Sequence, residues 1–122
     1  MIERYSRKEL KSIWEDYNKY SIWLDIELAA AEAMEKLKII PRGVVKKIKL
    51  KANINVKRIT DIENKVKHDV IAFLTSITEK AGKEARYLHK GMTSSDVLDT
   101  CFNLQLKQSG IILLKDIDEL LR

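Results

Sequence analysis

The segment 89–96 (HKGMTSSD) carries the residue types best suited to chemistry in this chain. Thr93 and Asp96 have the spacing of a capping box, with Asp in place of the usual Glu, so we expect a helix to begin here. The first turn of a helix offers unpaired N–H groups and the positive end of the helix dipole, which together favour an anionic ligand. A cap needs only one hydroxyl. Ser94 and Ser95 therefore supply surplus hydroxyls that could hold a carboxylate.

The chain has two histidines, and both lie beside signals for the start of a helix. Lys67-His68-Asp69 places an imidazole between an ammonium and a carboxylate, an arrangement that can bind phosphate or pass a proton. His89 could donate a hydrogen bond to an anion held by the helix that follows it. An ordinary structural role stays open for both: a polar surface at a helix junction for His68, and a connector residue that caps a carbonyl for His89.

Arg4 and Tyr5 form a further candidate pair at the start of the chain. Arginine can grip a phosphate with two parallel hydrogen bonds. The alternative is a loose, exposed terminus without a ligand. Metal-ligand spacings, a P-loop and a dinucleotide-binding glycine motif are absent from the sequence, so we expect neither a metal ion nor a cofactor.

Helical periodicity runs through the sequence without an alternating strand pattern, so we expect an all-α fold. Four residues are expected to begin or end helices: Ser6 and Asn55 as N-caps, Pro41 in a first turn and Gly82 as a C-terminal stop. An apolar stripe from Ile22 to Leu37 predicts the inner face of the second helix. Residues 83–92 lack a clear period and predict a connector.

The helix expected after Thr93 is apolar on two faces. One stripe holds Val97, Cys101 and Leu104, and the other holds Leu98, Phe102 and Leu106. A helix of this kind must be buried on more than one side, and the preceding short helices are too few to enclose it. We therefore expect residues 1–92 to form an N-terminal helical domain, and residues 93–122 to begin a long central helix of a larger protein.

Composition sets the remaining limits. The formal net charge is +5 and the sequence pI is about 9.3, a modest basic excess that suits phosphate-bearing ligands. The basic run 46–51 lacks interleaved aromatic residues, so it indicates a solvated helix face rather than a nucleic-acid site. A single cysteine, Cys101, favours a reducing cytoplasm. No apolar run resembles a signal peptide or approaches the ~20 residues that cross a bilayer.

Taken in order, several segments resemble the N-terminal part of the adenylosuccinate lyase family, a branch of the fumarase/aspartase superfamily. The segments that carry the resemblance are 1–6 (MIERYS), Ile13-Trp14, Trp23-Leu24, Ile39-Ile40-Pro41, 67–73 (KHDVIAF) and 89–96. Each segment alone is a weak signal. The ordered set is specific, and it spans nearly the whole chain.

The resemblance implies a β-elimination that cleaves a C–N bond and releases fumarate from a nucleotide substrate. It implies that Arg4 and Tyr5 contact the nucleotide end, and that Lys67, His68 and Asp69 line the same site. Thr93 and Ser94 would hold a succinyl carboxylate at the helix start. His89 would support the site or assist proton transfer.

The resemblance also implies a homotetramer whose sites combine residues from three subunits, with the principal acid and base beyond residue 122. The chain alone is then expected to be inactive. One departure is Lys67, where the family usually has Arg, because lysine keeps the charge but loses the planar fork. Two alternatives stay open: an argininosuccinate lyase-like relative, and a small helical module that binds a partner protein through its last helix.

Overall fold

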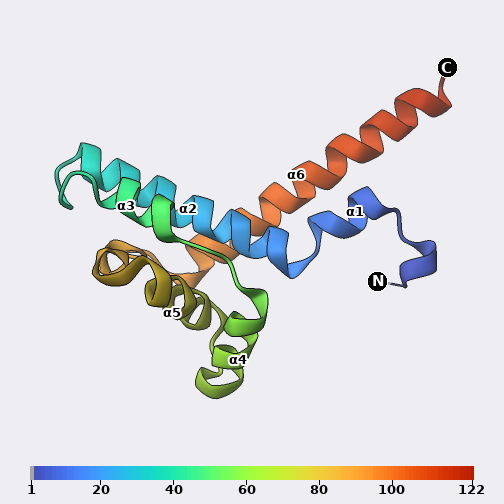
Figure 1. Ribbon diagram of the computed structural model, residues 1–122. Helices are drawn as coiled ribbons and strands as arrows, with labels where there is room; N and C mark the ends of the chain where they lie inside the picture. The colour runs from blue at the N-terminus through green and yellow to red at the C-terminus, as the bar shows by residue number, and fades with distance from the viewer. Residues whose placement is uncertain (1) are drawn as a thin grey trace.

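The computed structural model describes residues 2–122, apart from the side chain of Glu3. The described part of the chain folds into helices joined by short turns and contains no strand, which confirms the all-α prediction (Figure 1). The helices are η1 (Glu3–Tyr5), α1 (Lys8–Ile13), α2 (Asp16–Lys36), α3 (Val44–Lys51), α4 (Val56–Val66), α5 (Asp69–Ala81), η2 (Gly82–Tyr87) and α6 (Ser94–Leu120). None of the helices described is long and apolar enough to span a membrane.

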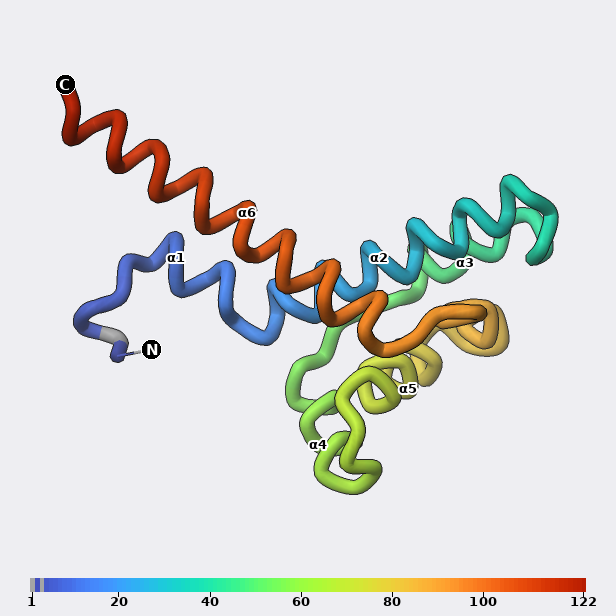
Figure 2. Tube along the Cα trace, turned by 180° about the vertical axis from the view of Figure 1, so that it is seen from behind, coloured from blue at the N-terminus to red at the C-terminus, as the bar shows by residue number. Residues whose placement is uncertain are grey.

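Helix α2 is the support on which the other elements pack. Helix α3 folds back along it, α4 and α5 pair beneath it, and α6 crosses it (Figures 1 and 2). The centre of the core is aromatic: Tyr20 and Trp23 of α2 meet Phe73 of α5, with ring centroids 5.2–5.9 Å apart. Phe73 is fully buried. Large rings in edge and stacked contact fix α5 against α2.

The first half of α6 is tied to α1 and α2 by buried polar contacts. Gln105 donates from Nε2 to the Ile13 carbonyl at the end of α1 (2.8 Å). Asn18 donates to the same carbonyl (2.8 Å) and to Gln108 Oε1 (3.1 Å). Cys101 is 2% exposed at this crossing, which confirms its prediction as a core residue. These bonds satisfy the carbonyl that α1 leaves free at its end.

Beyond this crossing, α6 extends away from α2 to α5, and in the described part of the chain it runs beside α1 and the segment that precedes α1 (Figure 2). Arg7 forms an ion pair with Asp116 there. The apolar side chains of α6 that remain exposed are Phe102, Leu104, Leu106, Ile111, Leu113, Leu114, Ile117 and Leu120. An exposed apolar face of this length is unusual for a protein that acts as a monomer.

Two of the four predicted helix signals are correct. Asn55 caps α4 by accepting the Arg58 N–H (3.0 Å), and Gly82 ends α5 with a positive φ. Ser6 is not an N-cap, because its hydroxyl donates back to the Ile2 carbonyl (2.7 Å) and α1 begins after Arg7. The prediction for Pro41 is also wrong: α3 begins at Val44, after a left-handed Gly43.

The predicted apolar stripe of α2 is partly correct. Ile22 is buried, and Ile26 and Met34 pack against the core, but Ala29, Ala33 and Leu37 are exposed. The buried side chains of this helix are Tyr20, Ile22, Trp23, Glu27, Leu28 and Ala31. The inner face therefore includes a carboxylate at its centre. The predicted connector 83–92 is also partly helical, because η2 covers Gly82–Tyr87.

Candidate functional site

The turn before α6 is held in an unusual backbone conformation. His89 has a φ of 58° and Gly91 a φ of 74°, and the Met92 N–H donates to the His89 carbonyl (3.4 Å). The left-handed region suits glycine, but it is disfavoured for a residue with a Cβ. This double left-handed turn links the buried Leu88 to the start of α6.

The predicted capping box at the start of α6 is confirmed. Thr93 is the N-cap, and its N–H donates to Asp96 Oδ2 (2.8 Å). The Thr93 hydroxyl lies 3.3 Å from the same oxygen. Within the described residues, the hydroxyls of Ser94 and Ser95 form no hydrogen bond with another protein group. The helix start thus presents hydroxyl and N–H donors beside the positive end of the dipole.

His89 is held by a residue that the sequence analysis missed. The carboxylate of Glu27, on α2, accepts the backbone N–H of His89 on Oε2 (2.6 Å), and its Oε1 lies 2.6 Å from Nδ1 of the imidazole. Glu27 is 1% exposed, whereas the His89 side chain is 22% exposed. A signal was available: Glu27 lies four residues from both Trp23 and Ala31, so it falls inside an apolar helix face.

His68 lies at the junction of α4 and α5. Lys67 ends α4 with a φ of 55°, and His68 caps α5 with Nδ1 accepting the Ile71 N–H (3.4 Å). A neutral ring that accepts on Nδ1 carries its proton on Nε2. Asp69 Oδ1 accepts the Val70 N–H (2.7 Å) and lies 3.6 Å from His68 Nδ1. The half-exposed imidazole therefore offers an Nε2–H donor to a ligand.

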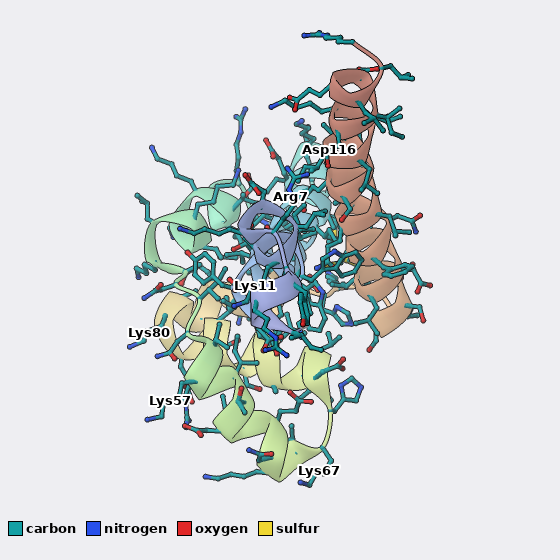
Figure 3. All side chains as sticks on the ribbon, turned by 90° about the vertical axis from the view of Figure 1, so that its right-hand side faces the viewer. Arg7, Lys11, Lys57, Lys67, Lys80 and Asp116 are labelled. Atoms are coloured by element: carbon teal, nitrogen blue, oxygen red, sulfur yellow. The ribbon has the colours of Figure 1, made fainter. Side chains whose placement is uncertain are left out.

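Arg4 and Tyr5 lie apart from the other candidates. The Arg4 guanidinium stacks over the Tyr5 ring at 4.9 Å, and both side chains are exposed. Their helix η1 lies beside the N-terminus in Figure 1, away from α4 and α5. Figure 3 shows the same separation, with Arg7 next to Asp116 and Lys67 at the opposite end of the molecule.

The structure thus assembles three separate groups rather than one pocket. The groups are the Arg4–Tyr5 pair, the Lys67–Asp69 junction and the segment 89–96 with Glu27. Two open clefts of about 660 and 610 Å³ are lined by other residues, along the end of α2 and between α1 and α6. No group of three or more potential metal-ligating side chains lies together in the part of the chain that the structure describes. The arrangement suits recognition of an anion by helix starts and imidazoles.

Comparison with known proteins gives the chain a relative over nearly all of its length. It is 46% identical over 124 residues to the adenylosuccinate lyase of Aquifex aeolicus (strain VF5), a match that covers 99% of this chain and 28% of that protein. No protein-family model matches the chain. The chain therefore spans about a quarter of the length of the curated relative that it matches.

A solved structure shares the fold. The fumarate lyase from Mesorhizobium sp. BNC1 superposes with a TM-score of 0.84 over 93% of this chain and 27% of that one, at 22% sequence identity. This likeness supports the helical architecture. In sequence the chain is similar to an adenylosuccinate lyase and in fold to a fumarate lyase, and both likenesses fit an N-terminal portion of such an enzyme.

Proposed function

We propose that this chain forms the N-terminal portion of a cytoplasmic adenylosuccinate lyase of purine nucleotide biosynthesis. The enzyme would cleave adenylosuccinate to AMP and fumarate, and the succinylaminoimidazole-carboxamide ribotide to its carboxamide ribotide and fumarate. The observation that carries the proposal is the 46% identity to an adenylosuccinate lyase across 99% of the chain.

The reaction is a β-elimination. A base removes a proton from the carbon next to a succinyl carboxylate, and the electron pair spreads into that carboxylate. The C–N bond then breaks, fumarate leaves, and an acid protonates the departing nitrogen. Thr93 and Ser94 would hold the carboxylate at the start of α6, where fixed donors and the helix dipole stabilise the growing charge. His89 would support the site or assist proton transfer beside them.

The nucleotide end would be held by the other two groups. Lys67 supplies a cation beside the Nε2–H donor of His68, a pair suited to phosphate or to the leaving amine. Lys67 acts as a point charge here, without the two-pronged grip of arginine. Asp69 lies beside His68 at the same junction. Arg4 and Tyr5 would approach from a different subunit, since they lie on another part of this chain.

A homotetramer would unite these groups. Residues 93–122 would begin the long helix of a central bundle, and residues 1–92 would form the N-terminal domain. The uncovered apolar face of α6 supports this proposal, because it offers a surface for neighbouring helices. The same face would suit a small helical module that binds a partner protein, which is the alternative function. Neither nucleic acid nor a membrane is a proposed partner.

The test uses the gene product that contains these residues, with loss of the ultraviolet absorbance of adenylosuccinate as the signal. Two variants address the site. His68→Asn removes the imidazole but keeps an N-cap for α5, because asparagine is among the best capping residues. Ser94→Ala removes one hydroxyl at the start of α6. Each variant should lower kcat/KM by at least about tenfold, with melting temperatures close to that of the unaltered protein.

Thr100→Ala is the matched control, because it removes an exposed hydroxyl from the same helix beyond its first turn. It should leave kcat/KM within about twofold. Near-normal turnover of both site variants would refute the residue assignments. Turnover of argininosuccinate but not of adenylosuccinate would favour the sister lyase. A folded, monomeric gene product that turns over neither substrate would favour the interaction module. The isolated 122-residue chain is expected to be inactive.

A further inference from the structure

The most unusual side chain in this structure is the buried carboxylate of Glu27. It lies at the centre of α2 and is 1% exposed. Its only hydrogen-bond partner found among the described residues is His89, which lies 62 positions later in the chain. Both carboxylate oxygens are used, each at 2.6 Å: one on the backbone N–H and the other on Nδ1 of the ring. One side chain thus fixes both the main chain and the imidazole of His89.

Stability alone gives no reason to keep a charge at this position. Taking a carboxylate out of water is costly, and well-packed apolar residues often match or exceed a buried ion pair in stability. The neighbouring positions on the same helix face, Trp23 and Ala31, show that apolar side chains fit there. A carboxylate in this place therefore points to control of geometry.

The backbone at His89 leads to the same conclusion. Its φ of 58° lies in the left-handed region, which is disfavoured for a residue with a Cβ. Such a conformation persists when the surroundings hold it, and the short bond from the His89 N–H to Glu27 does so. Backbone strain of this kind concentrates at ligand and active sites.

The ring contact decides where the imidazole keeps its proton. A carboxylate 2.6 Å from Nδ1 needs a proton on that nitrogen, whether the ring is neutral or charged. In the neutral ring, Nε2 is then left with its lone pair. His68 has the opposite arrangement, because its Nδ1 accepts a backbone N–H. The two histidines therefore offer different groups to a ligand: a donor at His68 and, in the neutral state, an acceptor at His89.

We propose that Glu27 is a positioning residue for His89: its carboxylate holds the imidazole with Nδ1 protonated and Nε2 turned to the substrate. This inference rests on the proposed lyase function and deepens it. It gives His89 a defined chemical role, in which Nε2 accepts a proton or a hydrogen bond from the substrate, or donates one once the ring is charged.

Glu27→Gln tests the proposal with almost no change in shape. The amide oxygen can accept the His89 N–H, but the NH₂ group can only donate to Nδ1, so the ring proton must move to Nε2. We expect kcat to fall at least about tenfold, while KM and the melting temperature change little. When His89 is already replaced by Asn, adding Glu27→Gln should lower kcat by less than about twofold. Equal losses in both backgrounds would overturn the proposal.

A spectroscopic measurement reports on the ring without relying on turnover. Solid-state ¹⁵N NMR of the histidine-labelled gene product would show the state of Nδ1, with the His89 signal identified by its loss in His89→Asn. We expect a protonated Nδ1 in the unaltered protein and a bare Nδ1 in Glu27→Gln. A bare Nδ1 in the unaltered protein, or no change in the variant, would overturn the inference. Absence of turnover in the unaltered protein would instead refute only the proposed function.

Two variants control for fold and charge. Glu32→Gln removes a carboxylate from the same helix at an exposed position and should leave kcat unchanged. His89→Asn retains a short donor near Nδ1 for Glu27 and tolerates a positive φ, but lacks Nε2. It should fold normally and keep only a low, measurable kcat, which keeps the proposal testable if Glu27→Gln fails to fold. Normal turnover of His89→Asn would also overturn it.

Discussion

Removing the Asp96 side chain should loosen the start of α6 by a predictable amount. Asp96 accepts the Thr93 N–H at 2.8 Å and lies 3.3 Å from the Thr93 hydroxyl, at an exposed helix start. Loss of one capping interaction costs about 1 kcal/mol. Loss of a negative charge in the first turn adds about 0.3–1 kcal/mol. Asp96→Ala should therefore destabilise this helix start by about 1–2 kcal/mol.

Hydrogen exchange measured by mass spectrometry is the appropriate assay, because it reports local opening without global unfolding. A loss of about 1–2 kcal/mol corresponds to roughly 5- to 30-fold faster exchange in the first two turns of α6. Asp99→Ala is the control: it removes the same charge one turn later, at an exposed side chain that makes no capping bond. The reasoning fails if the two variants accelerate exchange equally, or if Asp96→Ala changes it by less than about twofold.

Three further predictions concern stability and reactivity. Ala31 is completely buried in α2, so Ala31→Leu should cost about 1–3 kcal/mol by overpacking, and an unchanged melting temperature would contradict this. Burial raises the pKa of the Cys101 thiol, so alkylation by iodoacetamide at neutral pH should be slow until the protein is denatured, and rapid labelling of native protein would contradict this. A hydrogen bond from the Val45 N–H lowers the pKa of the Glu35 carboxyl from its ordinary value near 4.5. The ionised carboxylate therefore stabilises the folded protein above pH 4.5, and this stabilisation is lost as the pH falls through the lowered pKa of the folded state. Glu35→Gln should consequently reduce the denaturation midpoint at pH 7 but not at pH values below the lowered pKa, and a pH-independent difference would contradict this.

Features set by a few neighbouring residues were predictable from the sequence. The caps at Asn55 and Thr93 and the stop at Gly82 depend on short-range hydrogen bonds or on glycine's backbone freedom. The double apolar pattern after Thr93 likewise predicted a long helix that this chain leaves partly uncovered. Cys101 lies in the core as its helical position indicated.

Features set by distant contacts were missed. Ser6 has the spacing of a capping box with Glu9, but its hydroxyl turns back to Ile2 instead. The inner face of α2 depends on where α5 and α6 pack, which periodicity alone did not locate. Glu27 is the clearest case: an acidic residue in a helix normally indicates solvent, and only the approach of His89 allows its burial.

The link between Glu27 and His89 has a consequence for the order of events at the ribosome. The two residues are 62 positions apart, so at 5–20 residues per second His89 is synthesised roughly 3–12 s after Glu27. Until then the carboxylate is better solvated by water than by apolar contacts. We therefore expect the part of α2 around Glu27 to stay hydrated until the turn before α6 has been made. The core is completed at the same late stage, because it also contains Val97 and Cys101 of α6.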